Sequence, residues 1–358
     1  MSSSGSRAAG SGGTDQAPGS KPPGPGGPGL ARGALGLVAL GVGLDLLASR
    51  WLMAQVPHWL PPQASTAAPL VDDLFRLEVG IGCFLLLGCT AVMVWTLLFD
   101  RTGKYDRDDG EPIEGNLPLE ITWTVIPLVL VLLIAWQAIR VNGQLASLGG
   151  KVRVAGAAAA LRLVGIEGLA GGSGAAILPG SNGGSMLPTP RPGVAATELG
   201  PVVVIARQWS WEFVYPNGVR SGELHLPLNR PVRLRLLSLD VLHGLSIPAF
   251  RLRQDVVPGS VIDYRLTPSR EGRYRLRDSL FSGAYFAANQ TDVVVESEAA
   301  FASWLENALA SPLVPNPNPA SELWQQRLRQ GNRGWATVAP AAPPLVNAPL
   351  DLNAPHAG

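Results

Sequence analysis

Two long uncharged apolar runs constrain this chain more than any other feature. Residues 79–99 (VGIGCFLLLGCTAVMVWTLLF) and residues 121–139 (ITWTVIPLVLVLLIAWQAI) contain no charged side chain. A helix of about 20 apolar residues crosses a hydrocarbon core of about 30 Å, so each run can span a membrane. Two such runs joined by a short polar loop are a poor match for buried helices of a large soluble domain. We therefore expect a transmembrane helical hairpin over residues 74–140.

A third apolar stretch precedes these two runs but is shorter. Residues 33–44 are uncharged, and Asp45 and Arg50 then interrupt the pattern. A stretch of this length fits either the core of a signal peptide or a marginal transmembrane segment. Residues 33–50 are therefore assigned to one of these two alternatives.

Basic side chains orient the hairpin. The loop between the two long runs carries Arg101, Lys104 and Arg107, whereas Arg50 is the only Lys or Arg of segment 45–75. Short loops rich in Lys and Arg stay in the cytoplasm. This rule predicts a cytoplasmic loop and places everything after residue 140 on the opposite, exported side.

Composition divides the rest of the chain. Gly and Pro, 42 and 32 of the 358 residues, concentrate in residues 1–32, 143–199 and 311–358. These segments lack hydrophobic periodicity, which is typical of loose chain. We expect a disordered N-terminus, a Gly/Ala-rich insert or linker, and a Pro/Ala-rich tail, in that order. The net charge of +1 gives no basic signature for nucleic acid, so no nucleic-acid partner is expected.

Residues 200–310 contain short runs that are typical of strands. In "PVRLRLLS", Val232, Leu234 and Leu236 alternate with Arg233 and Arg235, as in a half-buried strand. Turn sequences separate the runs, and several short strands in about 100 residues favour an antiparallel sandwich. The segment "SEAAFASWLENALA" at residues 297–310 predicts a closing helix that a serine can cap. The fold class is therefore a membrane hairpin followed by an all-β exported domain.

Four motifs give this architecture a family resemblance. They are "EITWTVIP" (120–127), "RQWSWEFVYPNG" (207–218), the run "ELHLPLNRPVRLRLLSLDVLHGLSIPAFRLRQDVVPGS" (223–260) and "EGRYRLRDSLFSGAYFAANQTDVVV" (271–295). In this order they resemble subunit II of the cytochrome oxidases of the haem-copper superfamily. The resemblance implies a cupredoxin-like Greek-key sandwich. It also implies that oxidase subunit I, subunit III and membrane lipid are the partners.

The same resemblance implies a copper site, and this sequence departs from it. The family's dinuclear copper centre takes one early His and then the pattern C-x-E-x-C-x-x-x-H-x-x-M, because thiolates bridge the soft copper pair. His243 matches the early His. The remaining positions keep their spacing but are substituted, with Asp278 and Ser282 at the two Cys, Leu280 at the Glu, Phe286 at the second His and Asn289 at the Met.

The substitutions predict that the chain binds no metal. Cys83 and Cys89, the two cysteines, both lie in the first long run, so no thiolate site is available in the exported domain. His243 is then interpreted as a retained core or interface histidine. The resemblance places haems and one copper in the partner subunit I, and no cofactor in this chain.

Loss of the copper relay points to the quinol oxidases, the branch of the family in which this loss is the rule. We expect a structural and assembly subunit, without a catalytic centre of its own, of a quinol-oxidising terminal oxidase that reduces oxygen and translocates protons. The motif "PLVDDLF" (69–75) is similar to cyanobacterial subunits II, which suggests their alternative respiratory terminal oxidase. The expected location is a prokaryotic cytoplasmic or thylakoid membrane, with the exported domain on the periplasmic or lumenal side.

Two other functions stay open. One is a cytochrome c oxidase subunit II that receives electrons from cytochrome c, against which the missing cysteines argue. The other is a membrane-anchored cupredoxin-like binding or assembly protein, against which "EITWTVIP" argues. Arginines near the loop, such as Arg273 and Arg275, are unexpected on a face for a basic carrier, but they also fit solvated strand faces.

The resemblance also singles out three residues outside the copper pattern. Trp209 and Trp211 match the family's aromatic pair, the first of which is associated with the arrival of electrons; a packing role is the alternative. Glu120 matches a position associated with proton uptake into subunit I. An ionisable residue at a helix end is equally consistent with an interfacial anchor.

Overall fold

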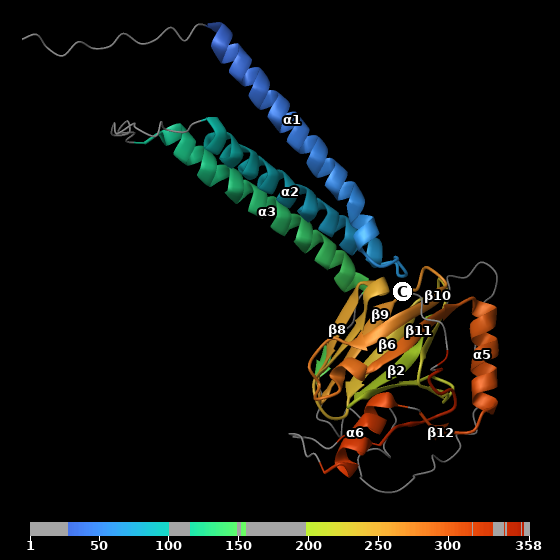
Figure 1. Ribbon diagram of the computed structural model, residues 1–358. Helices are drawn as coiled ribbons and strands as arrows, with labels where there is room; N and C mark the ends of the chain where they lie inside the picture. Colours follow the sequence, from blue (N-terminus) through green and yellow to red (C-terminus); the bar gives the residue numbers. More distant parts are fainter. Residues whose placement is uncertain are drawn as a thin grey trace, which may run out of the picture.

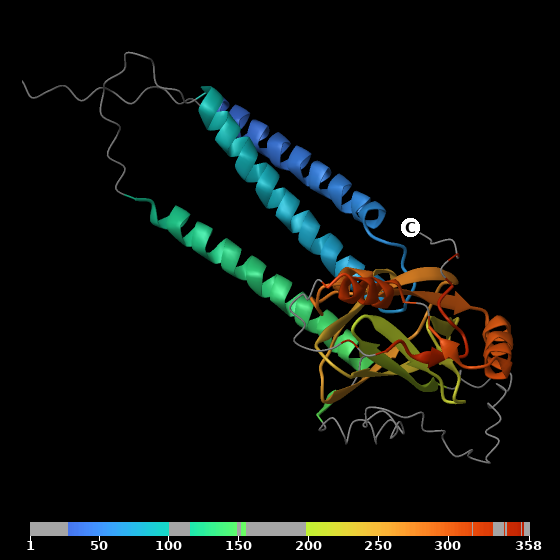
Figure 2. The same ribbon diagram turned by 60° about the horizontal axis from the view of Figure 1, so that its bottom comes forward.

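The computed structural model describes residues 28–99, 115–148, 152–154, 198–316, 318–331, 340, 342–351 and 353. Most of the predicted disordered N-terminus (residues 1–32) and most of the predicted insert lie outside these residues; residues 28–32 belong to the first helix. Three of the described helices are long and apolar enough to cross a membrane. They are α1 (Pro28–Trp59), α2 (Ala68–Phe99) and α3 (Leu117–Leu148). All of them extend from the same side of a β-sandwich (Figures 1 and 2).

The first helix extends beyond the expected segment. Residues 33–50, expected to be either a signal peptide or a marginal transmembrane segment, belong to α1, which has the same 32-residue length as α2 and is long and apolar enough to cross a membrane. Glycines of α2 let α1 pack closely: a methyl group at Gly80 would lie 2.3 Å from Met53 Sδ, and one at Gly88 would lie 3.1 Å from Asp45 Oδ2. Small residues commonly allow such close helix packing in membranes. The membrane part is therefore a hairpin with an additional helix.

The exported domain consists mainly of two packed sheets. The described strands of the larger sheet follow the order β1-β9-β6-β2-β3-β4, and those of the smaller sheet the order β5-β11-β10-β7-β8. The pairs β2–β6 and β5–β11 are parallel. The strands are β1 (Val152–Val154), β2 (Leu199–Arg207), β3 (Ser210–Val214), β4 (Arg220–Ser221), β5 (Leu224–Pro227), β6 (Val232–Ser238), β7 (His243–Ile247), β8 (Leu252–Val256), β9 (Ser260–Leu266), β10 (Gly272–Asp278) and β11 (Gln290–Glu296).

The alternation predicted for β6 is confirmed. Val232, Leu234 and Leu236 are fully buried in the core between the sheets, and Arg235 points to the other face, where its Nε lies 2.8 Å from Asp263 Oδ1. The closing helix is also confirmed as α5 (Glu298–Ala310). Ser297 caps it by accepting a hydrogen bond from Ala300 N.

Two segments that were predicted to be loose contain regular structure. The helix α3 continues to Leu148, and β1 pairs with β9, so part of the predicted insert is helix and strand. The predicted tail contains β12 (Val314–Pro315), α6 (Pro319–Arg329) and β13 (Leu345–Val346), with β12 and β13 paired. These tail elements pack on the sandwich (Figure 1).

The linker between α1 and α2 docks on the sandwich. Ser65 Oγ donates to Phe250 O at 2.9 Å, and Ala64 N donates to Ala249 O at 2.9 Å. Next to it, the Arg251 guanidinium holds the Asp72 carboxylate, with Nε–Oδ1 at 2.6 Å and Nη2–Oδ2 at 2.9 Å. Both side chains are buried. The exported domain is therefore attached to the membrane helices at several points and not by one flexible tether.

Candidate functional site

Sheet topology brings three of the sequence-predicted positions to one end of the smaller sheet. His243 begins β7, Asp278 ends β10, and these strands are paired neighbours. Asn289 immediately precedes β11, the other neighbour of β10. The loop between β10 and β11 then supplies Ser282. The paired strands and the loop therefore bring these four side chains together.

Asp278 is the centre of a buried polar cluster. Its Oδ2 accepts hydrogen bonds from Ser282 Oγ at 2.7 Å and from Asn289 Nδ2 at 3.1 Å. The same oxygen lies 2.7 Å from His243 Nδ1. All four residues are buried. The side chains at three substituted positions therefore bind one another and His243.

The other oxygen of Asp278 binds the backbone. Oδ1 accepts from Gly244 N at 2.8 Å and from Leu280 N at 3.1 Å. Burial alone would raise the pKa of Asp278, but the hydrogen bonds from His243, Gly244 N and Ser282 outweigh it and lower the pKa below its ordinary value. The carboxylate is therefore ionised.

His243 lies between two carboxylates. Its Nε2 is 2.8 Å from Asp240 Oδ1, and its Nδ1 faces Asp278. Burial alone would lower the pKa of His243, but the hydrogen bonds to Asp240 and Asp278 outweigh it and raise the pKa. The two carboxylates therefore favour the protonated form of the ring, in which both nitrogens donate.

The residues present do not fit a dinuclear copper centre. Both nitrogens of His243 are engaged by carboxylates. The two cysteines, Cys83 and Cys89, lie in α2, so the described part of the exported domain offers no thiolate ligand. Asn289 Oδ1 is buried and has no hydrogen-bond partner among the described residues, but an amide oxygen is a hard ligand and a poor one for copper(I). Among the described residues, no group of three or more His, Cys, Asp or Glu could hold a metal ion.

Two substituted side chains lie beside the cluster and add no ligand. Phe286 lies in a short 3-10 helix (Phe286–Ala288) and packs edge-to-face on Phe281, with ring centroids 5.3 Å apart. Leu280 contributes its backbone N–H, while its side chain is half-buried next to Gly244. A phenyl ring and an isobutyl group carry no lone pair for a metal.

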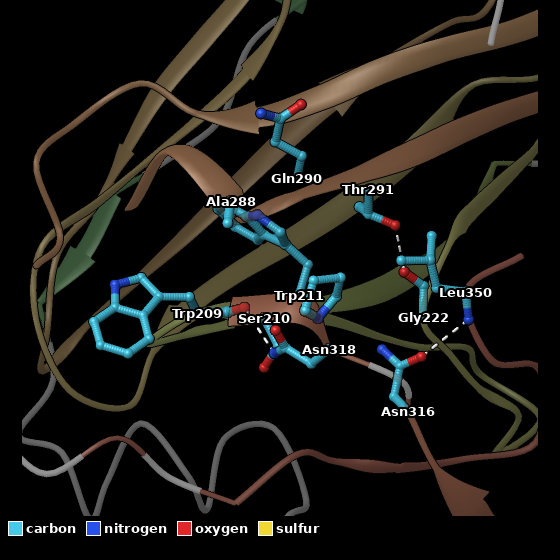
Figure 3. A pocket seen from close by; sticks show the side chains of 11 residues that line it. Trp209, Ser210, Trp211, Gly222, Ala288, Gln290, Thr291, Asn316, Asn318 and Leu350 are labelled. Carbon is cyan, nitrogen blue, oxygen red and sulfur yellow. Dashed lines mark hydrogen bonds between the residues drawn. The ribbon is translucent and has the colours of Figure 1, made fainter. Parts of the chain in front are cut away.

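The aromatic pair packs directly on the loop. Trp211 Nε1 donates to Asn289 O at 3.2 Å, and its ring lies edge-on to His243 at a centroid distance of 6.0 Å. Trp209 Nε1 donates to Ser282 O at 3.2 Å. Only 3% of Trp209 is exposed, and it lies beside a small hollow that Figure 3 shows. Both indoles therefore have structural contacts.

Sequence reasoning missed Asp240 and Gln208. Asp240 Oδ2 accepts from Gln208 N at 2.5 Å, and Gln208 Nε2 donates to Ser282 O at 2.6 Å. The available signal for Asp240 was its position three residues before His243 in a turn between strands. Polar turn residues beside a buried histidine are candidate partners for it.

Glu120 lies far from this cluster. It is exposed in the first turn of α3, at the end of the helix that points away from the sandwich (Figure 1). Its backbone oxygen accepts from Thr124 Oγ1 at 2.9 Å. This position is the cytoplasmic end under the predicted orientation.

Two of the three arginines of β10, Arg273 and Arg275, form ion pairs. Arg273 contacts Glu223 and Asp292, with Nε–Oδ2 to Asp292 at 2.6 Å, and Arg275 Nη1 lies 3.5 Å from Asp292 Oδ1. Carboxylates therefore neutralise much of this positive face. The interpretation as solvated strand faces accounts for Arg273 and Arg275.

These features define a class: a membrane-anchored cupredoxin-like subunit whose copper loop holds a polar cluster. The comparisons then give the family. The profile described as "Cytochrome C oxidase subunit II, periplasmic domain" matches residues 219–297. The cytochrome c oxidase subunit 2 of Thermostichus vulcanus is 31% identical over 271 residues, covering 72% of this chain and 81% of the relative.

Of two further relatives, one is named as a cytochrome c oxidase subunit and the other as a quinol oxidase subunit. The cytochrome c oxidase subunit 2 of Synechocystis sp. is 34% identical over 268 residues, covering 71% of this chain and 77% of the relative. The quinol oxidase subunit 2 of Bacillus subtilis is 25% identical over 242 residues, covering 66% of this chain and 61% of the relative. The chain belongs to the cytochrome oxidase subunit II family. It is thus a membrane-bound component of a terminal oxidase complex with subunit I, and its C-terminal domain lies on the exported side.

Proposed function

We propose that this chain is a subunit II without copper, in a terminal oxidase that takes electrons from a membrane quinol. The observation that carries the proposal is the sealed cluster around Asp278 and His243. A copper pair in this place would require soft bridging ligands. It would also have to separate the buried His243 ring from two carboxylates.

The cluster also lacks a redox-active group. A soluble carrier that docks on this domain has no acceptor here to reduce. Electrons then have to reach the haems of subunit I without passing through this chain. A quinol dissolved in the membrane can deliver them directly to subunit I, so no residue of this chain is assigned to quinol.

The remaining role is structural. The linker contacts at Ser65 and Ala64 and the ion pair between Asp72 and Arg251 fix the exported domain on the membrane helices. An anchored domain of this kind can hold subunit I, and with it subunit III, in an assembled oxidase. Proton uptake near Glu120 is part of the same proposal, because its carboxylate is exposed at the cytoplasmic end of α3.

The second candidate is a cytochrome c oxidase subunit II. The relatives at 31% and 34% identity carry that name, which favours it, and the substituted loop argues against it. The cyanobacterial source of both relatives agrees with an alternative respiratory oxidase of these organisms.

Metal content and donor preference together test the proposal. The purified complex is analysed for copper and haem iron, and oxygen uptake is measured with reduced quinol and with reduced cytochrome c. We expect copper that matches the centre of subunit I alone, and rapid uptake with quinol only. Extra copper equal to a dinuclear centre, together with rapid oxidation of cytochrome c, would refute the proposal in favour of the second candidate.

A further inference from the structure

The C-terminal residues 311–316, 318–331 and 342–351, here called the C-terminal cover, are built into the sandwich. They complete the edge strand β4: Asn347 N donates to Arg220 O at 2.8 Å, and Gly222 N donates to Ala348 O at 2.8 Å. Exposed edge strands present unpaired backbone groups that attract other chains. The cover satisfies this edge from within the same molecule.

Close packing fixes the cover next to the aromatic pair. A methyl group at Gly222 would lie 2.6 Å from Asn316 Oδ1, so a larger residue would push the Asn316 side chain away. The same oxygen accepts from Leu350 N at 2.9 Å. Figure 3 shows Asn316 and Leu350 on one side of the small hollow and Trp209 on another.

Helix α6 then lies over Trp209. Asn318 caps the helix through its Oδ1 and donates from Nδ2 to Trp209 O at 2.7 Å. The ring of Trp324 lies 5.6 Å from that of Trp209 and 6.4 Å from that of Tyr285. Tyr285 itself contacts Trp209 edge-on at 5.0 Å. Trp209 is therefore enclosed between the loop beneath it and α6.

This enclosure matters because the indole of Trp209 touches the loop directly. It donates to Ser282 O, and a methyl group at Gly283 would lie 3.1 Å from its Cζ2. A protein that docked on this face without the cover would meet this ring, one side chain away from the polar cluster. With the cover it meets the outer side of α6, where Leu323 and Leu328 are exposed.

We propose that the C-terminal cover prevents soluble redox proteins from docking on the surface above Trp209. The cover belongs to the same chain, so its effective concentration at this surface is high and a competitor must displace it. The inference rests on the proposed function, which identifies the electron donor as a quinol. It assigns a role to the C-terminal cover, which contains neither a copper-ligand position nor a membrane segment.

Hydroxyl-radical labelling of the assembled oxidase tests the enclosure. The variants are the intact chain, a chain that ends at Ala310, Trp324→Ala, and the control Leu328→Ala on the exposed side of α6. Mass spectrometry follows oxidation of Trp209. We expect labelling to rise several-fold on truncation and to a smaller extent in Trp324→Ala, and to stay unchanged in Leu328→Ala. Equal labelling in the intact and both cover variants overturns the inference.

Labelling of Tyr215, buried in the core beneath α5, reports whether the truncated domain stays folded. If truncation also exposes Tyr215, the truncated domain has unfolded, and the labelling of Trp209 in Trp324→Ala is then the test of the enclosure.

Binding of mitochondrial-type ferrocytochrome c to the same complexes at low ionic strength tests the exclusion. We expect several-fold tighter binding after truncation or Trp324→Ala, and an unchanged affinity in Leu328→Ala. Exposure of Trp209 without a gain in affinity also overturns the inference. A failure of the proposed function gives a different result from a failure of this inference. The intact complex would then oxidise the cytochrome and contain extra copper.

Discussion

Replacing Asp278 with Asn tests how much the polar cluster stabilises the exported domain. The substitution keeps the shape of the side chain but removes its charge. The oxygen Oδ2, which now serves His243, Ser282 and Asn289, becomes a donor that faces three other donors. The two backbone hydrogen bonds to Oδ1 can persist. The change therefore leaves the buried His243 ring with Asp240 as its remaining carboxylate partner.

The expected loss is large. A hydrogen bond to a charged group contributes about 1.5–3 kcal/mol, and removal of one partner from a buried ion pair costs about 3–5 kcal/mol. The hydroxyl of Ser282 can rotate and recover part of the loss, so we expect about 3–5 kcal/mol in total. For a domain of this size, that corresponds to a fall in Tm of more than about 10 °C.

Near-ultraviolet circular dichroism of the intact chain in detergent follows the thermal unfolding of the domain through its tryptophans. The matched control is Asp255→Asn, which removes the same charge from an exposed position on β8 and should change stability by less than about 0.5 kcal/mol. Equal Tm values for the two variants would refute the reasoning that the cluster around Asp278 stabilises the domain.

The pKa shifts of Asp278 and His243 determine how the stability from the cluster changes with pH. The pKa of Asp278 is lowered from 3.8, so its contribution is present above that value and is lost as pH falls through the lower folded value. The pKa of His243 is raised from 6.5, so its contribution is present below that value and is lost as pH rises through the higher folded value. The difference in Tm between the wild type and Asp278→Asn should therefore be largest between these two ordinary values and should narrow on either side.

Three further predictions address the frame of the loop, the proton path and the anchor. With His243 retained, the ligand set Asp278→Cys, Leu280→Glu, Ser282→Cys, Phe286→His and Asn289→Met should bind copper and give near-infrared absorbance; a folded variant that takes up no copper would show that spacing alone does not preserve the site. In the assembled oxidase, Glu120→Gln should lower proton pumping several-fold while Glu120→Asp retains it, and unchanged turnover and pumping in Glu120→Gln would remove the proton role. Asp72→Asn leaves Arg251 buried without its carboxylate, which should destabilise the junction by about 3–5 kcal/mol; faster proteolysis of the linker at residues 60–67 measures this, and wild-type resistance would contradict it.

The sequence was informative where a local pattern decides the structure. The alternation in β6 and the fixed spacing of the copper loop both depend on short-range periodicity, and the structure places His243, Asp278, Ser282 and Asn289 together. The partner Asp240 could not be assigned, because its role depends on how a turn folds against His243 and Gln208.

Two larger elements escaped prediction for different reasons. The helix α1 was underestimated because Asp45 and Arg50 interrupt its uncharged run, although close packing against α2 accommodates Asp45. The helix α6 lies in a segment whose Pro and Ala content suggested loose chain. Asn318 followed by Pro319 is nevertheless a helix start signal, with an N-cap residue before Pro at the first helical position. Its docking on Trp209 depends on tertiary contacts that no local pattern encodes.

The docked linker between α1 and α2 also has a consequence for biosynthesis. Ser65 and its partner Phe250 are separated by 185 residues of chain. At about 5–20 residues per second, synthesis of that interval takes about 9–37 seconds. The linker therefore emerges on the exported face well before its docking surface exists. Asp72 is likewise synthesised 179 residues before its partner Arg251. The final orientation of the domain is set only after β7 and β8 have been translocated, so a stalled or truncated export intermediate would carry correctly inserted helices with an unattached linker.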